Sequence, residues 1–117
     1  MKKEFPVVDE NVTLKDAIIK MTEGKLGHVL FMENNKVKAL LSDGDLRRAM
    51  MSEDFNLEKA AIEFATKNPK TIKEDMLASD ALQFMEEKKI QFLPVVDESG
   101  NVVGVIHLHH LVEAGIK

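Results

Sequence analysis

The sequence predicts an α+β fold in which one β-α-β-β-α unit occurs twice in tandem. Short apolar runs of strand length alternate with segments whose apolar residues recur every three or four positions, the spacing of a helix face. The same face occurs in both halves, as Leu14, Ala17, Ile18 and Met21 and as Ala78, Ala81, Leu82 and Met85. Since neither unit is large enough to bury its own helices and sheet, we expect the two to pack around a pseudo-two-fold axis.

The first unit spans residues 5–52, and local signals predict its elements. Its strands are expected at 5–8, 29–32 and 37–41, with a hairpin turn at 33–36. Between the first two strands, Thr13 is placed to cap a helix that Gly24 ends. Asp43-Gly44 is a strong turn signal, so the second helix is expected to run from Asp45 to about Met51.

A linker and a second unit, residues 67–117, complete the chain. An apolar stripe predicts an amphipathic linker helix over 56–66, which Asn68-Pro69 would stop. The stripe consists of Leu57, Ala60, Ala61 and Phe64. The second unit is expected to have strands at 71–72, 93–96 and 102–107, a helix on the repeated face, and a further helix around Leu111. No flexible tract divides the chain, so residues 1–117 are expected to form a single module.

Composition excludes several classes of protein. The chain has 117 residues, a net charge of −4 and no cysteine, which rules out disulfides and thiolate chemistry and suits a cytoplasmic protein. Lysine and arginine are scattered among acids rather than gathered into the basic stripe of a nucleic-acid-binding surface. No apolar run approaches the roughly 20 residues of a membrane span. We therefore expect neither a nucleic-acid nor a membrane partner.

The segment Ser42-Asp43-Gly44-Asp45 is the strongest candidate site. An apolar strand passes into a helix there, so backbone N–H groups, a hydroxyl and two carboxylates meet at a helix N-terminus. Such a point can hold a polar ligand. It can also be a plain cap, which stabilises a helix by about 1 kcal/mol whatever the function. In either case we expect Asp45 to be an exposed carboxylate of the turn. Asp43 and Asp45 without further oxygen donors are weak evidence for a cation site.

Several strings resemble a known family. The repeat, with Leu93-Pro94-Val95-Val96-Asp97 and the following Val102-Val103-Gly104-Val105-Ile106, resembles the cystathionine-β-synthase (CBS) domain pair, or Bateman module. Three strings look like the C-terminal CBS pair of bacterial D-arabinose 5-phosphate isomerases: Ser42-Asp43-Gly44-Asp45-Leu46-Arg47-Arg48, Lys67-Asn68-Pro69-Lys70-Thr71-Ile72 and Val105-Ile106-His107-Leu108-His109. The resemblance covers essentially the whole chain, although His110 replaces a carboxylate that is usual in the family.

The resemblance implies a nucleotide site in the cleft between the units. In CBS pairs that bind nucleotides, a Ser/Thr-x-x-Asp turn holds the ribose, and the helix N-terminus attracts the phosphate. Ser42 and Asp45 fit this pattern, with Asp43 between them, Arg47 as a phosphate partner and Arg48 as a surface charge. The second unit is expected to supply an apolar slot and backbone groups for the base. Its contributing residues would be Thr71, Ile90, Gln91 and Phe92.

The histidines raise a separate question. His107 and His110 replace the Ser and Asp of the turn in the second unit, so a second, identical nucleotide is not expected there. His28, His107, His109 and His110 are expected to gather at one end of the cleft. They either make ordinary hydrogen bonds there, or bind zinc, for which imidazole is a suitable ligand. As a third alternative, they would bind an anion more strongly below about pH 6.5, where imidazole is charged.

The function that the resemblance implies is regulatory. The chain would be the C-terminal fragment of an arabinose 5-phosphate isomerase whose chemistry belongs to an N-terminal sugar-isomerase (SIS) domain. The parent would interconvert ribulose 5-phosphate and arabinose 5-phosphate for the Kdo sugar of lipopolysaccharide or capsule. No cofactor is required, and the expected regulator is an adenine or cytidine nucleotide, including a CMP-sugar. We expect the chain to form a homodimer through the helices around 14–21 and 46–51. The alternative function is a structural dimerisation module without ligand.

Overall fold

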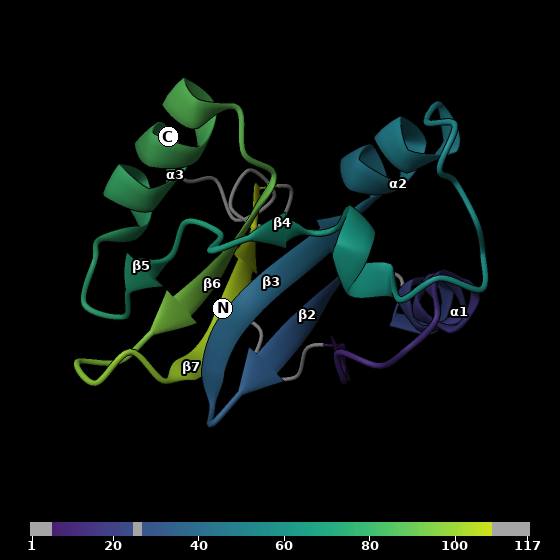
Figure 1. Cartoon of the computed structure of the whole chain (residues 1–117). Helices are drawn as coiled ribbons and strands as arrows, with labels where there is room; N and C mark the ends of the chain where they lie inside the picture. The colour runs from purple at the N-terminus through teal and green to yellow at the C-terminus, as the bar shows by residue number, and fades with distance from the viewer. Residues whose placement is uncertain (1–5, 25–26, 109–117) are drawn as a thin grey trace. The chain divides into compact units, whose positions relative to one another are not determined.

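The computed structural model describes residues 6–24 and 27–108 (Figure 1). The chain divides into two compact units, the first covering 5–69 and the second beginning at Lys70. Among the described residues, no helix is long and apolar enough to cross a membrane.

The first unit is built on a four-stranded sheet in the order β1-β2-β3-β4. β1 runs parallel to β2, and the other neighbours are antiparallel. The strands are β1 (Val7–Val8), β2 (His28–Glu33), β3 (Lys36–Ser42) and β4 (Thr66–Lys67). The helical elements are α1 (Leu14–Gly24), α2 (Asp43–Met50) and the short 3-10 helix η1 (Ala61–Phe64).

The core of the first unit follows the predicted periodicities. Val29 and Phe31 alternate along β2, as Ala39 and Leu41 do along β3, so all four point to one face of the sheet. The predicted face of α1 packs there through Leu14, Ala17 and Met21, which are at most 4% exposed. The Thr13 cap is confirmed, because its Oγ1 accepts a hydrogen bond from the Asp16 N–H at 3.2 Å.

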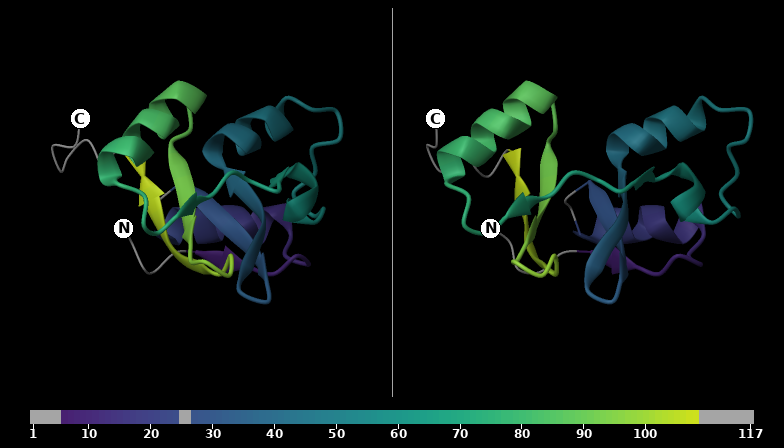
Figure 2. Two further views of the ribbon diagram at one scale, coloured as in Figure 1. Left: turned by 90° about the vertical axis from the view of Figure 1, so that its left-hand side faces the viewer. Right: turned by 60° about the vertical axis from the view of Figure 1, so that its left-hand side comes forward.

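The second unit repeats the order on a smaller scale (Figure 2). Its three-stranded sheet has the order β5-β6-β7, with β5 parallel to β6 and β7 antiparallel to it. The elements are β5 (Ile72–Lys73), α3 (Ala78–Lys88), β6 (Phe92–Val96) and β7 (Val102–His107). Ala81 and Met85 of α3 pack on Leu93 and Val95 of β6, as the repeated helix face predicts. The helix expected around Leu111 lies outside the described residues.

The predicted linker helix over 56–66 is wrong, because only η1 is helical there. The carbonyls of Leu57 and Lys59 instead accept hydrogen bonds from the N–H groups of Lys15 and Leu14, at 3.0 and 2.8 Å. A helix leaves its first N–H groups without internal partners, and this segment supplies acceptors for α1. The tertiary pairing therefore overrides the local apolar stripe.

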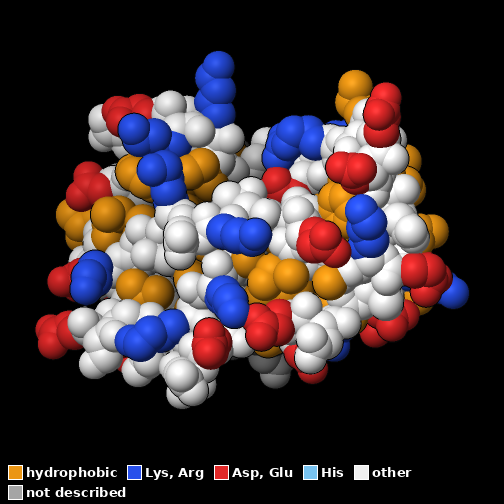
Figure 3. Space-filling model, in the orientation of Figure 1, with side chains coloured by type: hydrophobic (Ala, Val, Ile, Leu, Met, Phe, Trp, Pro, Cys, Tyr) orange, Lys and Arg blue, Asp and Glu red, His pale blue; other side chains and the backbone are white. Residues whose placement is uncertain are grey.

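The surface is charged with both signs. Figure 3 shows acidic and basic side chains interspersed over one face, with apolar side chains exposed between them. Among the described residues, the largest exposed fractions of apolar side chains belong to Met51 (87%), Leu77 (68%) and Met50 (61%).

Candidate functional site

Ser42 is the N-cap of α2, so this helix begins at Asp43 and not at Asp45. The Ser42 Oγ accepts a hydrogen bond from the Asp45 N–H at 3.2 Å, and the Ser42 N–H donates to Asp45 Oδ2 at 3.0 Å. This reciprocal capping box satisfies two backbone donors at the start of the helix. Asp43-Gly44 is therefore the first turn of α2 rather than a separate turn, which corrects the expected boundary.

The Asp45 carboxylate is buried, with 7% of its side chain exposed, so the expectation of an exposed carboxylate is wrong. Oδ2 accepts from the Ser42 N–H at 3.0 Å and from the Ser42 hydroxyl at 3.1 Å. Oδ1 accepts from Arg48 Nη2 at 2.6 Å and from Thr66 Oγ1 at 3.0 Å. Each carboxylate oxygen offers about two acceptor positions, and all of them are in use.

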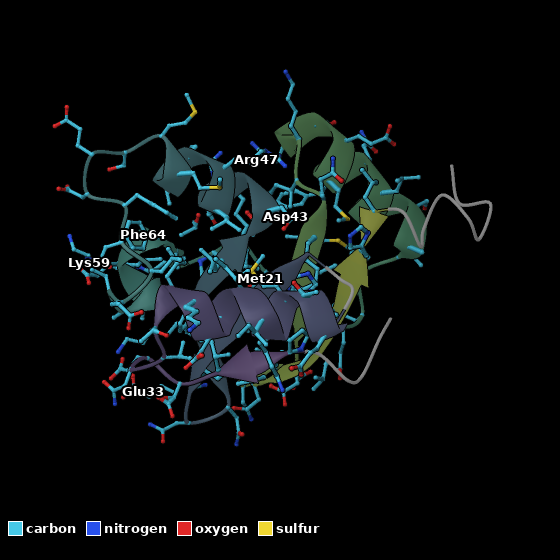
Figure 4. The ribbon with its side chains drawn as sticks, turned by 90° about the vertical axis from the view of Figure 1, so that its right-hand side faces the viewer. Met21, Glu33, Asp43, Arg47, Lys59 and Phe64 are labelled. Atoms are coloured by element: carbon cyan, nitrogen blue, oxygen red, sulfur yellow. The ribbon has the colours of Figure 1, made fainter. Side chains whose placement is uncertain are left out.

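Arg48 is a partner of Asp45 and not a simple surface charge. Its guanidinium reaches back along α2 to the carboxylate while 72% of its side chain stays exposed. The guanidinium lies beside Gly44, where a Cβ would be 3.5 Å from Arg48 Nη1, an ordinary van der Waals distance. Arg47 is exposed on the same helix (Figure 4), and its role toward a phosphate stays a prediction.

Thr66 is the residue of this cluster that sequence reasoning missed. It lies 21 residues after Asp45, on β4, where it pairs with Leu40 of β3. A strand of two residues has no periodicity to detect, and the stripe before it indicated a helix. The only available signal was a β-branched residue shortly before Asn68-Pro69.

Asp43 faces different surroundings from Asp45. It borders a hollow of about 340 Å³ together with residues of α1, α2 and the turn before β2 (Figure 4). The lining consists of Ile18, Met21, Thr22, Gly27, Asp43 and Leu46. Gly27 has φ +72°, and a Cβ there would lie 2.7 Å from Asp43 Oδ2, so this approach requires glycine.

The remaining predicted nucleotide-site residues belong to the second unit. Thr71 is exposed just before β5, and Ile90 packs on the core beside β6. The Gln91 carbonyl accepts from the Leu108 N–H at 2.8 Å. Phe92 is buried and pairs with His107 of β7, their ring centroids 6.5 Å apart. The structure thus gathers Gln91, Phe92 and His107 at one end of the second sheet, and their part in a nucleotide site stays a prediction.

Two of the four histidines are described. His28 is 1% exposed and pairs across the sheet with Ser42. His107 is half-buried at the end of β7, while His109 and His110 lie outside the described residues. Within residues 6–24 and 27–108, no group of three or more His, Cys, Asp or Glu side chains is placed to hold a metal ion.

Comparison with known sequences finds one family twice in this chain. The model described as "CBS domain" matches residues 1–52 and 60–117. An uncharacterized protein of Helicobacter pylori strain J99 is 44% identical over 115 residues, which are 97% of this chain and 35% of that protein. Arabinose 5-phosphate isomerase KdsD of Francisella tularensis is 36% identical over 114 residues, again 97% of this chain and 35% of that protein. The chain spans about a third of the length of these relatives.

Solved structures give the same fold. A CBS domain protein of Pyrobaculum aerophilum, complexed with AMP, matches with a TM-score of 0.83 at 20% identity, covering 93% of this chain and 84% of that one. CBSX2, also in complex with AMP, matches with a TM-score of 0.84 at 23% identity, covering 98% and 91%. The resemblance inferred from the sequence strings is confirmed: the chain belongs to the CBS domain family and carries two CBS domains in tandem.

Proposed function

We propose that this CBS pair senses an adenine nucleotide through the Ser42–Asp45 turn. The observation that carries the proposal is the Asp45 carboxylate, which is buried and held in a fixed orientation in the first turn of α2, three residues after Ser42. Its acceptor positions are already in use, so a ribose hydroxyl donates to this carboxylate by taking the place of one of its present partners. The N-terminus of α2 favours the negative charge of a phosphate.

The comparisons support an adenine nucleotide as the ligand class. AMP is bound in the Pyrobaculum aerophilum protein and in CBSX2, which share the fold of this chain. A cytidine nucleotide is the second ligand to test, because the resemblance to arabinose 5-phosphate isomerases implies a pathway that makes CMP-Kdo. A product of that pathway would be a chemically sensible feedback signal.

We further propose that the chain regulates a sugar-phosphate isomerase in the cytoplasm. The Francisella tularensis relative carries the name arabinose 5-phosphate isomerase, and this chain matches about a third of it. The other two thirds leave ample length for a catalytic SIS domain. The parent would then interconvert ribulose 5-phosphate and arabinose 5-phosphate, with the CBS pair biasing that activity.

A thermal-shift panel tests the proposed ligand class. The panel consists of AMP, ATP, CMP, CDP and a CMP-sugar at millimolar concentration. A ligand that binds the folded state at 100 times its Kd adds about 2.7 kcal/mol of stability, so at least AMP or ATP should raise Tm by several degrees. If no member of the panel moves Tm, the chain is not a nucleotide sensor.

A structural role is the second candidate. Ile19 of α1 is 47% exposed, and Met50 and Met51 at the end of α2 are 61% and 87% exposed. Apolar side chains at these positions fit a contact with a second copy of the chain. This candidate requires no ligand, so a nucleotide-induced rise in Tm separates it from the sensor.

A zinc-sensing role rests on the sequence alone. It requires His107 to act with His109 and His110, which lie beyond the described residues, or with His28. Calorimetry with zinc on the parent and on His107→Gln tests it, with a binding heat expected in the parent and a weaker one in the variant. Zinc binding is excluded if the parent gives no heat, and His107 is excluded as a ligand if both proteins give the same heat.

A further inference from the structure

The donors to the two carboxylate oxygens of Asp45 differ in their structural roles. The partners of Oδ2 are the N–H and hydroxyl of Ser42, which form the capping box of α2. The partners of Oδ1 are Thr66 and Arg48, which take no part in that box. Thr66 is exposed and Arg48 is 72% exposed, so water can solvate both groups when they leave. An incoming ligand therefore exchanges with donors at Oδ1 and not at Oδ2.

We propose that Thr66 is an intramolecular competitor of the ligand at Asp45. Its hydroxyl, 3.0 Å from Oδ1, is an alcohol donor of the same kind as a sugar hydroxyl. Because Oδ1 already accepts two hydrogen bonds, a sugar hydroxyl can donate to it only by displacing one of them. This inference rests on the proposed nucleotide site and adds a regulatory element to it.

Displacement of Thr66 changes how β4 is held. β4 pairs with β3 through Ala39 with Lys67 and Leu40 with Thr66, and the Asn68 N–H donates to the Lys38 carbonyl at 3.1 Å. The hydrogen bond from Thr66 to Asp45 adds a side-chain link from this short strand to α2. The second unit begins only three residues after Lys67, at Lys70. Occupation of Asp45 by a ligand therefore loosens the segment that leads into the second unit.

Competition between Thr66 and the ligand predicts the direction in which a substitution of Thr66 changes the affinity for AMP. Thr66→Val removes the hydroxyl at nearly constant volume and leaves one acceptor position of a buried carboxylate unpaired in the free protein. The ligand then satisfies that position without displacing Thr66, so the variant should bind AMP about three- to tenfold more tightly. The same substitution lowers the Tm of the free protein. If Thr66 only stabilised the fold, Tm would fall and affinity would not rise.

Isothermal titration of AMP into four proteins tests the competition. The proteins are the parent, Thr66→Val, Thr66→Ser and Thr13→Val. Thr66→Ser keeps the hydroxyl and should bind as the parent does. Thr13→Val is the matched control, because it loses the cap of α1 and hence stability, yet does not contact Asp45. It should lower Tm without changing the Kd for AMP.

The outcomes separate the two proposals. Tighter binding by Thr66→Val alone supports the competition. If the parent binds AMP and Thr66→Val binds it equally or more weakly, the competition is wrong and the nucleotide site stands. If neither protein binds any nucleotide of the panel, the proposed function fails and the competition falls with it. Thr66→Ala, which also lacks the hydroxyl, replaces Thr66→Val if the valine variant does not fold.

Discussion

The Asp45 carboxylate joins three segments of the first unit. It holds the end of β3 through Ser42, α2 through Arg48, and β4 through Thr66. A residue with this position stabilises the fold in addition to any role toward a ligand. The two contributions separate experimentally, because stability is measured without nucleotide.

Asp45→Ala should lower the free energy of unfolding by about 2–3 kcal/mol. The substitution leaves the Ser42 N–H, and the other groups that donate to Asp45, without their acceptor. Arg48→Ala should cost less than about 1 kcal/mol, because the guanidinium is largely exposed and its ion pair is screened by water. Urea unfolding of the ligand-free proteins measures both. If both variants lost the same free energy of unfolding, Asp45 would not be the acceptor that the donors of Ser42, Arg48 and Thr66 share.

Among the secondary-structure elements, the sequence predicted the helix faces and the hairpin turn, because residues close together in the chain determine both. The faces of α1 and α3 follow a 3.6-residue period, and the hairpin between β2 and β3 has Asn34 and Asn35 at positive φ, as a tight turn requires. The predicted linker helix does not form, because the carbonyls of Leu57 and Lys59 accept hydrogen bonds from the distant N-terminus of α1. β4 was missed for a similar reason, since only its pairing with β3 makes it a strand.

Lys38 of β3 links the loop before α1 to the sheet. Its ammonium donates a hydrogen bond to Glu10 and lies 3.7 Å from Glu33 Oε2. The hydrogen bond and the charge of Glu10 raise the pKa of Lys38 above its ordinary value of 10.5. A raised lysine pKa means that the pair stabilises the folded state fully below pH 10.5. The contribution is lost as the pH rises through the pKa of the folded state.

Lys38→Met should therefore destabilise the protein at neutral pH and low salt, and the difference from the parent should shrink at alkaline pH and in high salt. Urea unfolding at about pH 7 and about pH 11 measures this difference. Lys67→Met, on the exposed strand β4, is the control for losing a lysine elsewhere. A difference that is the same at both pH values would show that the ion pair contributes nothing.

At the scale of the whole molecule, the tandem repeat and the CBS family were predictable because repetition and short strings are properties of the sequence itself. The Ser-x-x-Asp spacing of Ser42 and Asp45 was predictable for the same reason. The burial of Asp45 and its bond to Thr66 were not, because they depend on a contact between residues 21 positions apart. The second-unit residues Thr71 and Gln91 stay predictions for the nucleotide site.

We expect the chain to be a homodimer at micromolar concentration, because apolar side chains are exposed at Ile19 of α1, at Met50 of α2 and at Met51 just after it. Light scattering coupled to gel filtration measures the mass. Met50→Lys combined with Met51→Lys should shift the protein toward monomer, while Leu77→Lys, at an exposed apolar position in the second unit, serves as the control. A parent that is monomeric at this concentration would contradict the expectation.

Isothermal titration of AMP into the parent and Asp45→Asn measures whether Asp45 takes part in nucleotide binding, as we propose. Asn keeps the size of the side chain but loses the charge and replaces one acceptor oxygen with an amide donor. The parent should bind AMP, and Asp45→Asn should bind it at least about tenfold more weakly. Asp54→Asn, an exposed carboxylate of the same unit, should bind as the parent does. The same Kd for AMP in the parent and in Asp45→Asn would show that this carboxylate does not hold the nucleotide.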